Sequence, residues 1–465
     1  MDKLLYVKEN DELLKFMLEQ RFFKVWKLKD SKEEYRKTLM EETSLELYLT
    51  ANCNQKCEYC YLQKYKDGIY PREYDTKEKV LSNLRILLQW IVDNNYAIPK
   101  IELYSGEIWE YEYGREVLQI LYEFVDKGLV TNHIMIPSNC SFLRNEEATG
   151  YIQRYINNFK KKGVRLSFSI SVDGKIVEDI SRPYNDGTSK NDDFYERMFI
   201  FAAHNEYYFH PMVAPVSIHK WIDNHKWWES ECEKYDLNVD KNVMMLEVRD
   251  SNWTDEQIED YNKFISYLID RHFEKLGTKE EFVQELLGEV NCKSDRLGGY
   301  VPYFLVDVDT YAGCSVANTL TVRLGDLAIC PCHRTAYNKY LYGKFVVEND
   351  KIVDIEANNS HMAMRILFAN NNLCHFGCDS CVFNPHCMKG CFGSQLETVQ
   401  DPFMPISNVC KLFQAKVINI LNKYEEYGIF DLLKEINPYS SAFIKAQNLI
   451  RFRKEVSNFV LGKNK

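Results

Sequence analysis

The stretch TANCNQKCEYCYL, residues 50–62, places three cysteines within eight residues. They are Cys53, Cys57 and Cys60, in the spacing Cys-x3-Cys-x2-Cys. A structural zinc site usually adds a second cysteine pair or two histidines close by, and no such partner stands near this group. A [4Fe–4S] cluster held by three thiolates instead keeps one iron open for a small molecule. The spacing therefore favours an iron–sulfur cluster over zinc.

A second group of cysteines stands in the C-terminal third of the chain. Its members are Cys314, Cys330, Cys332, Cys374, Cys378, Cys381, Cys387, Cys391 and Cys410. The pair Cys378-x2-Cys381 is typical of a zinc knuckle. Seven or more thiolates in one segment can equally hold two further iron–sulfur clusters. The residues alone leave both interpretations open.

Composition limits the compartment and the partners. The chain has 465 residues, 15 cysteines and a net charge of -10. In a reducing cytosol these cysteines are not expected to form disulfides. The negative charge disfavours nonspecific nucleic-acid binding, no apolar run is as long as a membrane span, and the first residues are too charged for a signal peptide. We expect a cytoplasmic protein that binds neither nucleic acid nor a membrane.

Strand and helix patterns alternate along residues 45–220, which indicates a parallel α/β architecture. Strand-like stretches such as SLELYLTANC, KIELYSGE and VRLSFSISVDG alternate with helical ones such as TKEKVLSNLRILLQWIVDNN. HPMVAPVS is expected to be a further strand. Sites in such folds lie at the carboxyl ends of the strands. The first cysteines and several small polar residues stand at these ends.

Beyond residue 220 the pattern changes. Residues 221–300 look mostly helical, and the segment from Gly313 to Cys410 is rich in loops and cysteine. We therefore expect five regions: an N-terminal extension of strand and helix (1–44), a partial barrel (45–220), a mostly helical bridging region (221–312), a cysteine-dense domain (313–411) and C-terminal helices (412–465).

The cysteine loop after the first strand resembles the defining motif of the radical S-adenosylmethionine (SAM) superfamily. Tyr59 fits the aromatic residue that usually precedes the third cysteine. The resemblance implies a partial (β/α)6 TIM-like barrel in which SAM binds the open iron and is cleaved to a 5′-deoxyadenosyl radical. Cys53, Cys57 and Cys60 would then be both the cluster ligands and the catalytic centre.

Motifs at later strand ends extend this resemblance. YSGEIW is similar to the Gly-Gly-Glu-Pro turn of the family, SISVDG with SRPYNDG to its Ser-x-Asp-Gly strand end and downstream arginine, and PSNC to its Thr-Asn-Gly strand end. Serine and isoleucine replace the first glycine and the proline of the turn. Besides Tyr59, the resemblance implies SAM contacts from Ser105, Gly106, Glu107, Ser138, Asn139, Ser171 and Arg182.

The second cysteine group resembles the SPASM domain, a loop-rich iron–sulfur domain found in one branch of this superfamily. The resemblance implies two auxiliary [4Fe–4S] clusters, and so three clusters in all. The outer cluster would be held by Cys378, Cys381, Cys387 and Cys410. The inner one would be held by Cys314, Cys330 and Cys391, with Cys332 as its fourth ligand or as a replacement for Cys330. In relatives the fourth position can also be a vacant site for substrate. Cys374 is a spare candidate and His333 a weaker one.

Enzymes of this branch mostly modify peptides and proteins. The resemblance implies a maturase that installs a thioether or carbon–carbon crosslink in a ribosomally synthesised precursor peptide, with a flavodoxin or ferredoxin as reducing partner. The alternative is a dehydrogenase or epimerase on another substrate, including formylglycine formation as in sulfatase maturation. A zinc-binding interaction protein is a remote third interpretation.

Two features bear on the choice of substrate. Sulfatase-maturing relatives have an aspartate close after the early cysteine of the second domain, where this chain has Pro331 after Cys330 and His333 after Cys332. This difference disfavours formylglycine formation. The 44 residues before the first strand are too few for a complete leader-binding module. Leader recognition is therefore expected elsewhere, for example in residues 221–300.

Overall fold

The computed structural model describes residues 44–64, 76–109, 113–248, 251–286, 319–336, 341–357, 378, 381, 391–401, 404–440, 443–444 and 447. The chain forms two compact units, each assembled from three stretches of sequence. The first unit takes residues 1–171, 183–207 and 315–370, and the second takes residues 172–182, 208–314 and 371–465.

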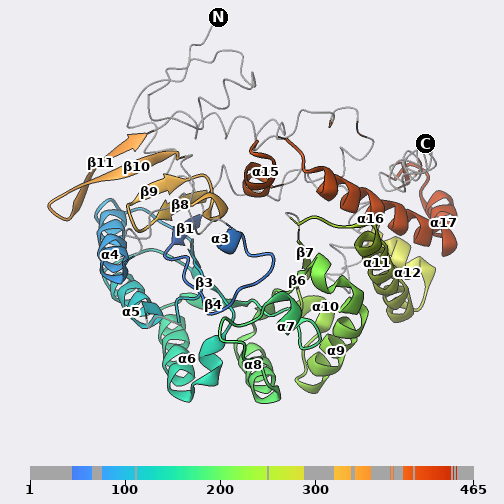
Figure 1. Ribbon diagram of the computed structural model, residues 1–465, viewed down its shortest axis with the longest axis horizontal. Helices are drawn as coiled ribbons and strands as arrows, with labels where there is room; N and C mark the ends of the chain where they lie inside the picture. Colours follow the sequence, from blue (N-terminus) through green and yellow to red (C-terminus); the bar gives the residue numbers. More distant parts are fainter. Residues whose placement is uncertain are drawn as a thin grey trace, which may run out of the picture. The chain divides into compact units, whose positions relative to one another are not determined.

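A large, mostly parallel sheet forms the centre of the first unit (Figure 1). Through this unit the strand order is β11-β10-β9-β8-β1-β2-β3-β4. Strands β8, β1, β2, β3 and β4 are parallel, whereas β9, β10 and β11 each run antiparallel to their neighbours. The bounds are β1 Ser44–Tyr48, β2 Lys100–Tyr104, β3 His133–Ser138, β4 Arg165–Ile170, β8 Thr319–Arg323, β9 Ala328–Cys330, β10 Gly343–Glu348 and β11 Lys351–Ala357.

The two faces of the parallel strands differ in chemistry because side chains alternate along a strand. One face is apolar and fully buried, with Leu45 and Leu47 from β1 beside Ile101 and Leu103 from β2. The other face carries polar and aromatic side chains, among them Glu46, which is also buried. We call this second surface the polar face. The expected α/β class is confirmed, and closure into a barrel stays a prediction.

The longer helices of this unit lie along one side of the parallel strands in Figure 1. Helix α4 begins after Thr76, whose hydroxyl accepts a hydrogen bond from the Lys79 amide, and α6 and α8 begin after Asn145 and Asn191 in the same way. These caps satisfy amides that the first helical turn leaves unpaired. The helices are α3 Tyr61–Lys64, α4 Lys77–Asp93, α5 Tyr113–Asp126, α6 Glu146–Lys161 and α8 Asp192–Asn205, with short 3-10 turns at Ser141–Arg144 and His333–Thr335.

Residues 319–357 differ from the loop-rich segment that the sequence suggests. Their strands β8 to β11 continue the sheet, and β8 pairs in parallel with β1. The buried Asn83 of α4 donates to the carbonyls of Leu324 and Gly325 and so holds the β8–β9 turn. Valine-rich and isoleucine-rich stretches can pair with a distant strand, which local patterns do not reveal.

Most described residues of the second unit are helical. The division into five regions stays a prediction, and its N-terminal extension lies, except for Ser44, outside the described residues. The predicted strand HPMVAPVS is limited to β6, Met212–Val213, because a 3-10 helix follows at Pro215–Lys220. Helix α11 has a capping box at Thr254 and Gln257 and ends at Gly277. The other bounds are β5 Tyr208–Phe209, β7 Leu246–Glu247, α7 Glu178–Ser181, α9 Trp221–Lys234, α10 Val239–Asn242, α11 Asp255–Leu276, α12 Lys279–Leu286, α15 Phe392–Val399, α16 Ser407–Glu426 and α17 Ile429–Ile436.

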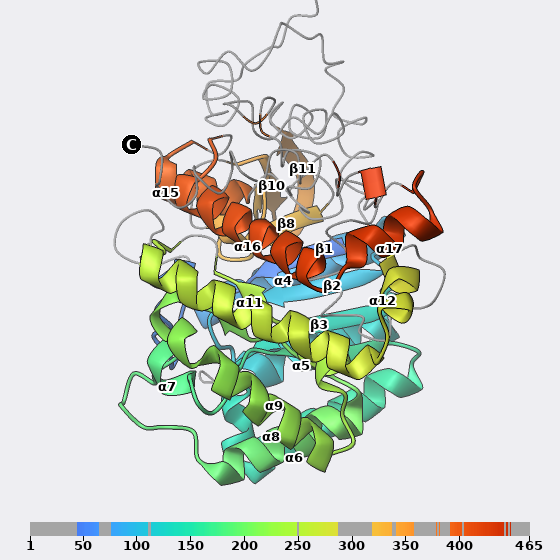
Figure 2. The same ribbon diagram turned by 90° about the vertical axis from the view of Figure 1, so that its right-hand side faces the viewer.

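Helices α11 and α16 pack side by side in the second unit (Figure 2). Ser266 bonds to Asn419, Asp270 pairs with Lys423, and the ring of Phe273 stacks on that of Tyr427 at 4.0 Å. Among the described helices, none combines the length and apolar character needed to cross a lipid bilayer.

Candidate functional site

The first three cysteines lie in the loop between β1 and α3, at the carboxyl end of β1. Cys53, Cys57 and Cys60 are reduced thiols and each is partly exposed. Cys140 and Cys232, in contrast, are buried, and burial raises the pKa of the Cys232 thiol to about 12. Metal ligation requires the thiolate. The loop, unlike the buried positions, therefore suits ligation.

The turn after β2 is joined to this cysteine loop through the backbone. The Gly106 amide donates to the Thr50 carbonyl at 2.7 Å, and the Glu107 amide donates to the Asn52 carbonyl at 2.7 Å. A Cβ atom at Gly106 would lie only 1.9 Å from the Asn52 oxygen. Glycine is therefore required where the loop crosses this turn.

The carboxylate of Glu107 links the end of β2 to the end of β3. Its Oε2 accepts from the Ser138 hydroxyl at 2.9 Å and from the Asn139 amide at 2.8 Å, and the side chain is 1% exposed. The Asn139 side-chain amide donates in turn to Asn54 Oδ1 at 2.7 Å. The structure thus brings Glu107, Ser138 and Asn139, three of the predicted SAM contacts, to the cysteine loop.

Residues 183–185 run antiparallel to the cysteine loop and bond to it. The Asn185 amide donates to the Asn54 carbonyl at 2.9 Å, and the Asn185 side chain donates to the Cys53 carbonyl at 2.8 Å. The Lys56 amide donates to the Pro183 carbonyl at 3.0 Å. We call residues 183–185 the clasp. The sequence did not predict that these residues bond to the cysteine loop, although they lie in the SRPYNDG stretch.

Ser105 has a feature that fits a bound cofactor. Among the described residues its buried hydroxyl oxygen has no hydrogen-bond partner, and buried polar groups normally have one. Ser105 stands directly before Gly106 at the end of β2. Tyr59, another predicted contact, is partly buried within the loop.

Two further predicted SAM contacts have structural partners. The Ser171 amide donates to the Ser138 carbonyl at 2.8 Å, which holds the end of β4 beside β3. Arg182 belongs to the second unit, where its Nε donates to the buried Asp173 carboxylate at 2.9 Å. A role for either residue in SAM binding stays a prediction.

A buried carboxylate on the polar face escaped the sequence analysis. Glu46 Oε2 accepts from the Thr321 hydroxyl at 2.7 Å and from the His333 amide at 3.1 Å, and His333 Nδ1 lies 3.3 Å away. Burial alone would raise the pKa of Glu46, but His333 lowers it below its ordinary value. The His333 ring stacks on Tyr104 with centroids 3.7 Å apart. The sequence does contain a sign of this site, because Glu46 stands between Leu45 and Leu47 in a strand expected to be buried.

Cys330 and Cys332 occupy different environments in the first unit. Cys330 is fully buried in β9, packs with Tyr48, Leu62 and Ala336, and has its thiol pKa raised to about 12 by burial. Cys332 follows the end of β9 and is 8% exposed, and its amide donates to the Thr335 hydroxyl at 3.2 Å. Which of the two would hold the inner cluster stays a prediction.

The other described cysteines of the second group belong to the second unit. The Cys381 amide donates to the Cys378 carbonyl at 3.0 Å, so these two residues share a tight turn. Cys391 precedes α15, Cys410 lies in α16, and all four are partly exposed. Cys314, Cys374 and Cys387 lie outside the described residues. The assignment of ligands to two auxiliary clusters therefore stays a prediction.

The donor chemistry of the first loop fits a cluster. Within the described ranges no three His, Cys, Asp or Glu side chains converge as a single metal ion would need. The thiolates of a [4Fe–4S] cluster surround a larger centre than a single ion, since each binds a different iron atom of one cubane. Three partly exposed thiols in one loop, beside a buried hydroxyl without a partner, fit a cluster with an open iron and a bound polar cofactor.

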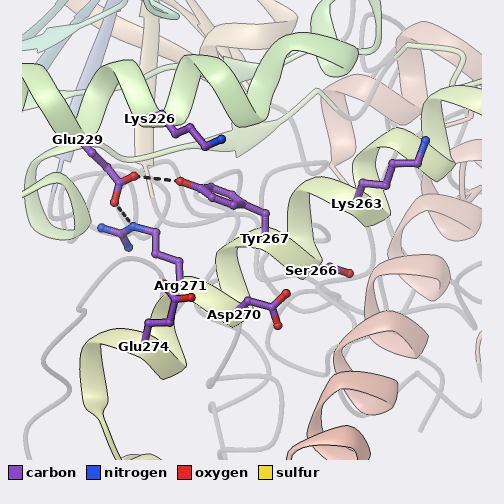
Figure 3. Close-up of a pocket in the computed structure, with 8 residues that line it drawn as sticks. All are labelled: Lys226, Glu229, Lys263, Ser266, Tyr267, Asp270, Arg271 and Glu274. Carbon is purple, nitrogen blue, oxygen red and sulfur yellow. Dashed lines mark hydrogen bonds and ion pairs between the residues drawn. The ribbon is translucent and has the colours of Figure 1, made fainter.

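The second unit contains an open pocket of about 570 Å³, lined by residues with polar or charged groups (Figure 3). Helices α9 and α11 supply its lining side chains, which are Lys226, Glu229, Lys263, Ser266, Tyr267, Asp270, Arg271 and Glu274. Glu229 pairs with Arg271 and accepts from the Tyr267 hydroxyl at 2.9 Å, and Arg271 also pairs with Asp240 at 2.8 Å. This polar network joins α9, α10 and α11 and contains none of the predicted cofactor residues.

Comparison with known proteins identifies the fold. No family model and no curated protein sequence matches the chain. Solved structures do match, among them native anSMEcpe with bound AdoMet, at a TM-score of 0.51 and 15% identity over 84% of this chain and 100% of that chain. Native anSMEcpe with bound AdoMet and Kp18Cys peptide matches at 0.52 and 14%, over 84% and 99%.

The enzyme anSMEcpe is a radical SAM, SPASM-domain anaerobic sulfatase-maturating enzyme. The resemblance in the sequence implies a fold of this kind, and the comparison finds a shared fold. At 14–15% identity the two proteins share their fold, and activity and substrate need a separate argument.

Proposed function

We propose that this chain is a radical SAM enzyme that modifies a peptide substrate. One observation carries the proposal: three partly exposed cysteines lie in the loop after β1, and the ends of β2 and β3 bond to that loop. Cys53, Cys57 and Cys60 would hold a [4Fe–4S] cluster, whose open iron would bind SAM. When bound, the cluster and SAM supply a 5′-deoxyadenosyl radical that abstracts a hydrogen atom from the substrate.

The chain's own residues shape the place where this chemistry would occur. Gly106 and Glu107 hold the cysteine loop through backbone bonds, and the Glu107 carboxylate keeps Ser138 and Asn139 beside it. The buried Ser105 hydroxyl is available to a polar group of the cofactor. These contacts would hold the loop that carries the thiols. Two auxiliary clusters, a reducing partner such as a flavodoxin or ferredoxin, and a cytoplasmic location remain part of the proposal.

Two candidate reactions fit the proposal, and they differ in the product that the enzyme forms. The first is a thioether or carbon–carbon crosslink in a ribosomally synthesised peptide, supported by the replacement of the expected aspartate with Pro331 and His333. The second is formylglycine formation or a related oxidation, supported by the fold shared with anSMEcpe, which is solved with a bound peptide. Both candidates take a peptide and use the same radical.

Anaerobic reconstitution tests the radical SAM assignment. We expect a brown protein with about twelve iron atoms per chain that cleaves SAM to 5′-deoxyadenosine. Replacing Cys53, Cys57 and Cys60 together by alanine should remove about four iron atoms and reduce SAM cleavage to background. Cys232→Ala is the matched control, because this buried thiol lies in α9 of the second unit. Stoichiometric zinc without iron, or SAM cleavage that survives the triple substitution, would refute the assignment.

Mass spectrometry of treated peptides distinguishes the two candidates. Cysteine-containing synthetic peptides are incubated with the reconstituted enzyme, SAM and dithionite. A crosslink removes two hydrogen atoms and joins two side chains, whereas formylglycine formation from cysteine removes two hydrogen atoms and also replaces sulfur with oxygen. An epimerase leaves the mass unchanged in water and introduces deuterium from D2O. A product with oxygen in place of sulfur would reject the crosslinking candidate in favour of the second.

A further inference from the structure

The clasp, residues 183–185, holds three successive peptide groups of the cysteine loop. The carbonyl of Cys53 accepts from the Asn185 side chain, and the carbonyl of Asn54 accepts from the Asn185 amide. The amide of Lys56 donates to the Pro183 carbonyl. Gln55 and Tyr184 face each other across this short antiparallel bridge. The loop is therefore held along its backbone between the first two cysteines.

One of these peptide groups points at a cysteine sulfur. The Gln55 amide donates to Cys53 Sγ at 3.4 Å, and Gln55 is 1% exposed. The Asn54 carbonyl and the Gln55 N–H belong to the same peptide group, which is planar. Holding the Asn54 carbonyl against Asn185 therefore also holds the Gln55 N–H against the Cys53 sulfur.

We propose that the clasp raises the reduction potential of the cluster held by Cys53, Cys57 and Cys60 by fixing the Gln55 N–H toward the Cys53 sulfur. This inference rests on the proposed function. A reduced cluster carries one more negative charge than an oxidised one, and hydrogen bonds to its sulfurs favour the reduced state. Gln55 is buried and Cys53 is partly exposed, so solvent screens this bond only in part. Asn185 is thus a positioning residue that acts through the Gln55 peptide group.

Two substitutions weaken the clasp in steps. Asn185→Ala removes the side-chain bond to the Cys53 carbonyl, and Asn185→Pro also removes the amide that bonds to the Asn54 carbonyl. Asn191→Ala is the matched control. Asn191 also lies in the first unit, and its side chain caps α8 by accepting from the Phe194 amide. This control therefore removes an asparagine hydrogen bond of comparable strength away from the cysteine loop.

The measurement is a redox titration of the full-length reconstituted protein with dithionite, followed by electron paramagnetic resonance. The resonance signal that changes when SAM is added belongs to the cluster held by Cys53, Cys57 and Cys60. We expect the one-electron reduction to become about tenfold less favourable in Asn185→Pro, equal to a potential lower by about 59 mV. Asn185→Ala should shift it in the same direction by less, and Asn191→Ala should leave it unchanged.

Three outcomes would overturn the inference. They are an unchanged potential in both Asn185 variants at full iron content, a rise in potential, or an equal shift in the Asn191→Ala control. A wild-type protein without a SAM-sensitive signal would instead refute the proposed function, and this inference with it.

Hydrogen exchange of the cluster-free full-length protein gives a second readout if a variant loads iron poorly. The amides of Gln55 and Lys56 should exchange faster in both Asn185 variants than in wild type and Asn191→Ala. Unchanged exchange at these two amides would also count against the clasp.

Discussion

Gly106 is the residue at which a single added carbon should disturb the candidate site most. In Gly106→Ala, the new Cβ would lie 1.9 Å from the Asn52 carbonyl oxygen and 2.9 Å from that of Ala51. Backbone atoms cannot move aside as a flexible side chain can, so the cysteine loop must shift. We expect a loss of about 1–3 kcal/mol in stability. Iron content and 5′-deoxyadenosine formation after reconstitution should both fall.

Gly150→Ala serves as the control for this substitution. Gly150 lies within α6, and its nearest neighbour would be Arg154 Nη1 at 4.0 Å. Alanine should stabilise this helix by about 1 kcal/mol and leave iron content unchanged. If Gly106→Ala bound iron and cleaved SAM as wild type does, the loop would not need the close approach seen here.

At the scale of elements, Glu229 of α9 should make the second unit less stable at acid pH. Burial alone would raise the pKa of Glu229, but hydrogen bonds from His225 and Arg271 lower it to about 2. In an unfolded chain the pKa of this carboxyl would be near 4.5. The ionised form is therefore the one that stabilises the folded state. Its contribution is fully present above pH 4.5 and is lost as the pH falls toward 2.

The substitution Glu229→Gln isolates this contribution. We expect it to cost roughly 1–3 kcal/mol at pH 7, because Arg271 loses a charged hydrogen-bond partner. The difference between variant and wild type should shrink as the pH falls below 4.5. Urea unfolding followed by tryptophan fluorescence measures it, since Trp221, Trp227 and Trp228 lie in α9, the helix that carries Glu229. A difference that stayed constant with pH would show that ionisation of Glu229 contributes nothing.

At the scale of the whole molecule, neither compact unit corresponds to one continuous stretch of chain. The first unit draws its strand β8 from beyond residue 315, and β8 pairs with β1 along all five residues of each strand. β1 is thus a central strand only when the later segment is present. Leu45 and Leu47 of this strand are both fully buried.

A fragment of residues 1–220 should therefore fail to fold, although it contains the whole predicted barrel region. Without β8, β1 becomes an exposed apolar edge that favours association. We expect aggregates by size-exclusion chromatography and no cooperative thermal transition. Supplying residues 315–370 as a separate chain should improve its solubility. A soluble monomeric fragment with cooperative unfolding would show that β1 to β4 are sufficient alone.

The sequence by itself predicts much of the first unit. The patterns of β1, α4, β2, α5, β3, α6, β4 and α8 are local, because alternation and helical periodicity depend on neighbours in the chain. The spacing of Cys53, Cys57 and Cys60 is local too, and so is their place after a strand. The pattern of strands and helices also predicts the α/β class that the structure confirms.

Only the tertiary structure decided which distant residues meet this loop. It places β8 beside β1, Asn185 against the Cys53 carbonyl, and His333 against Glu46. The structure also shows that Cys330 is fully buried, whereas Cys332, two residues later in the chain, is 8% exposed. Periodicity reports how each segment buries its own side chains. It cannot report which partner a strand edge or a polar side chain will find, because such bonds form between groups far apart in sequence.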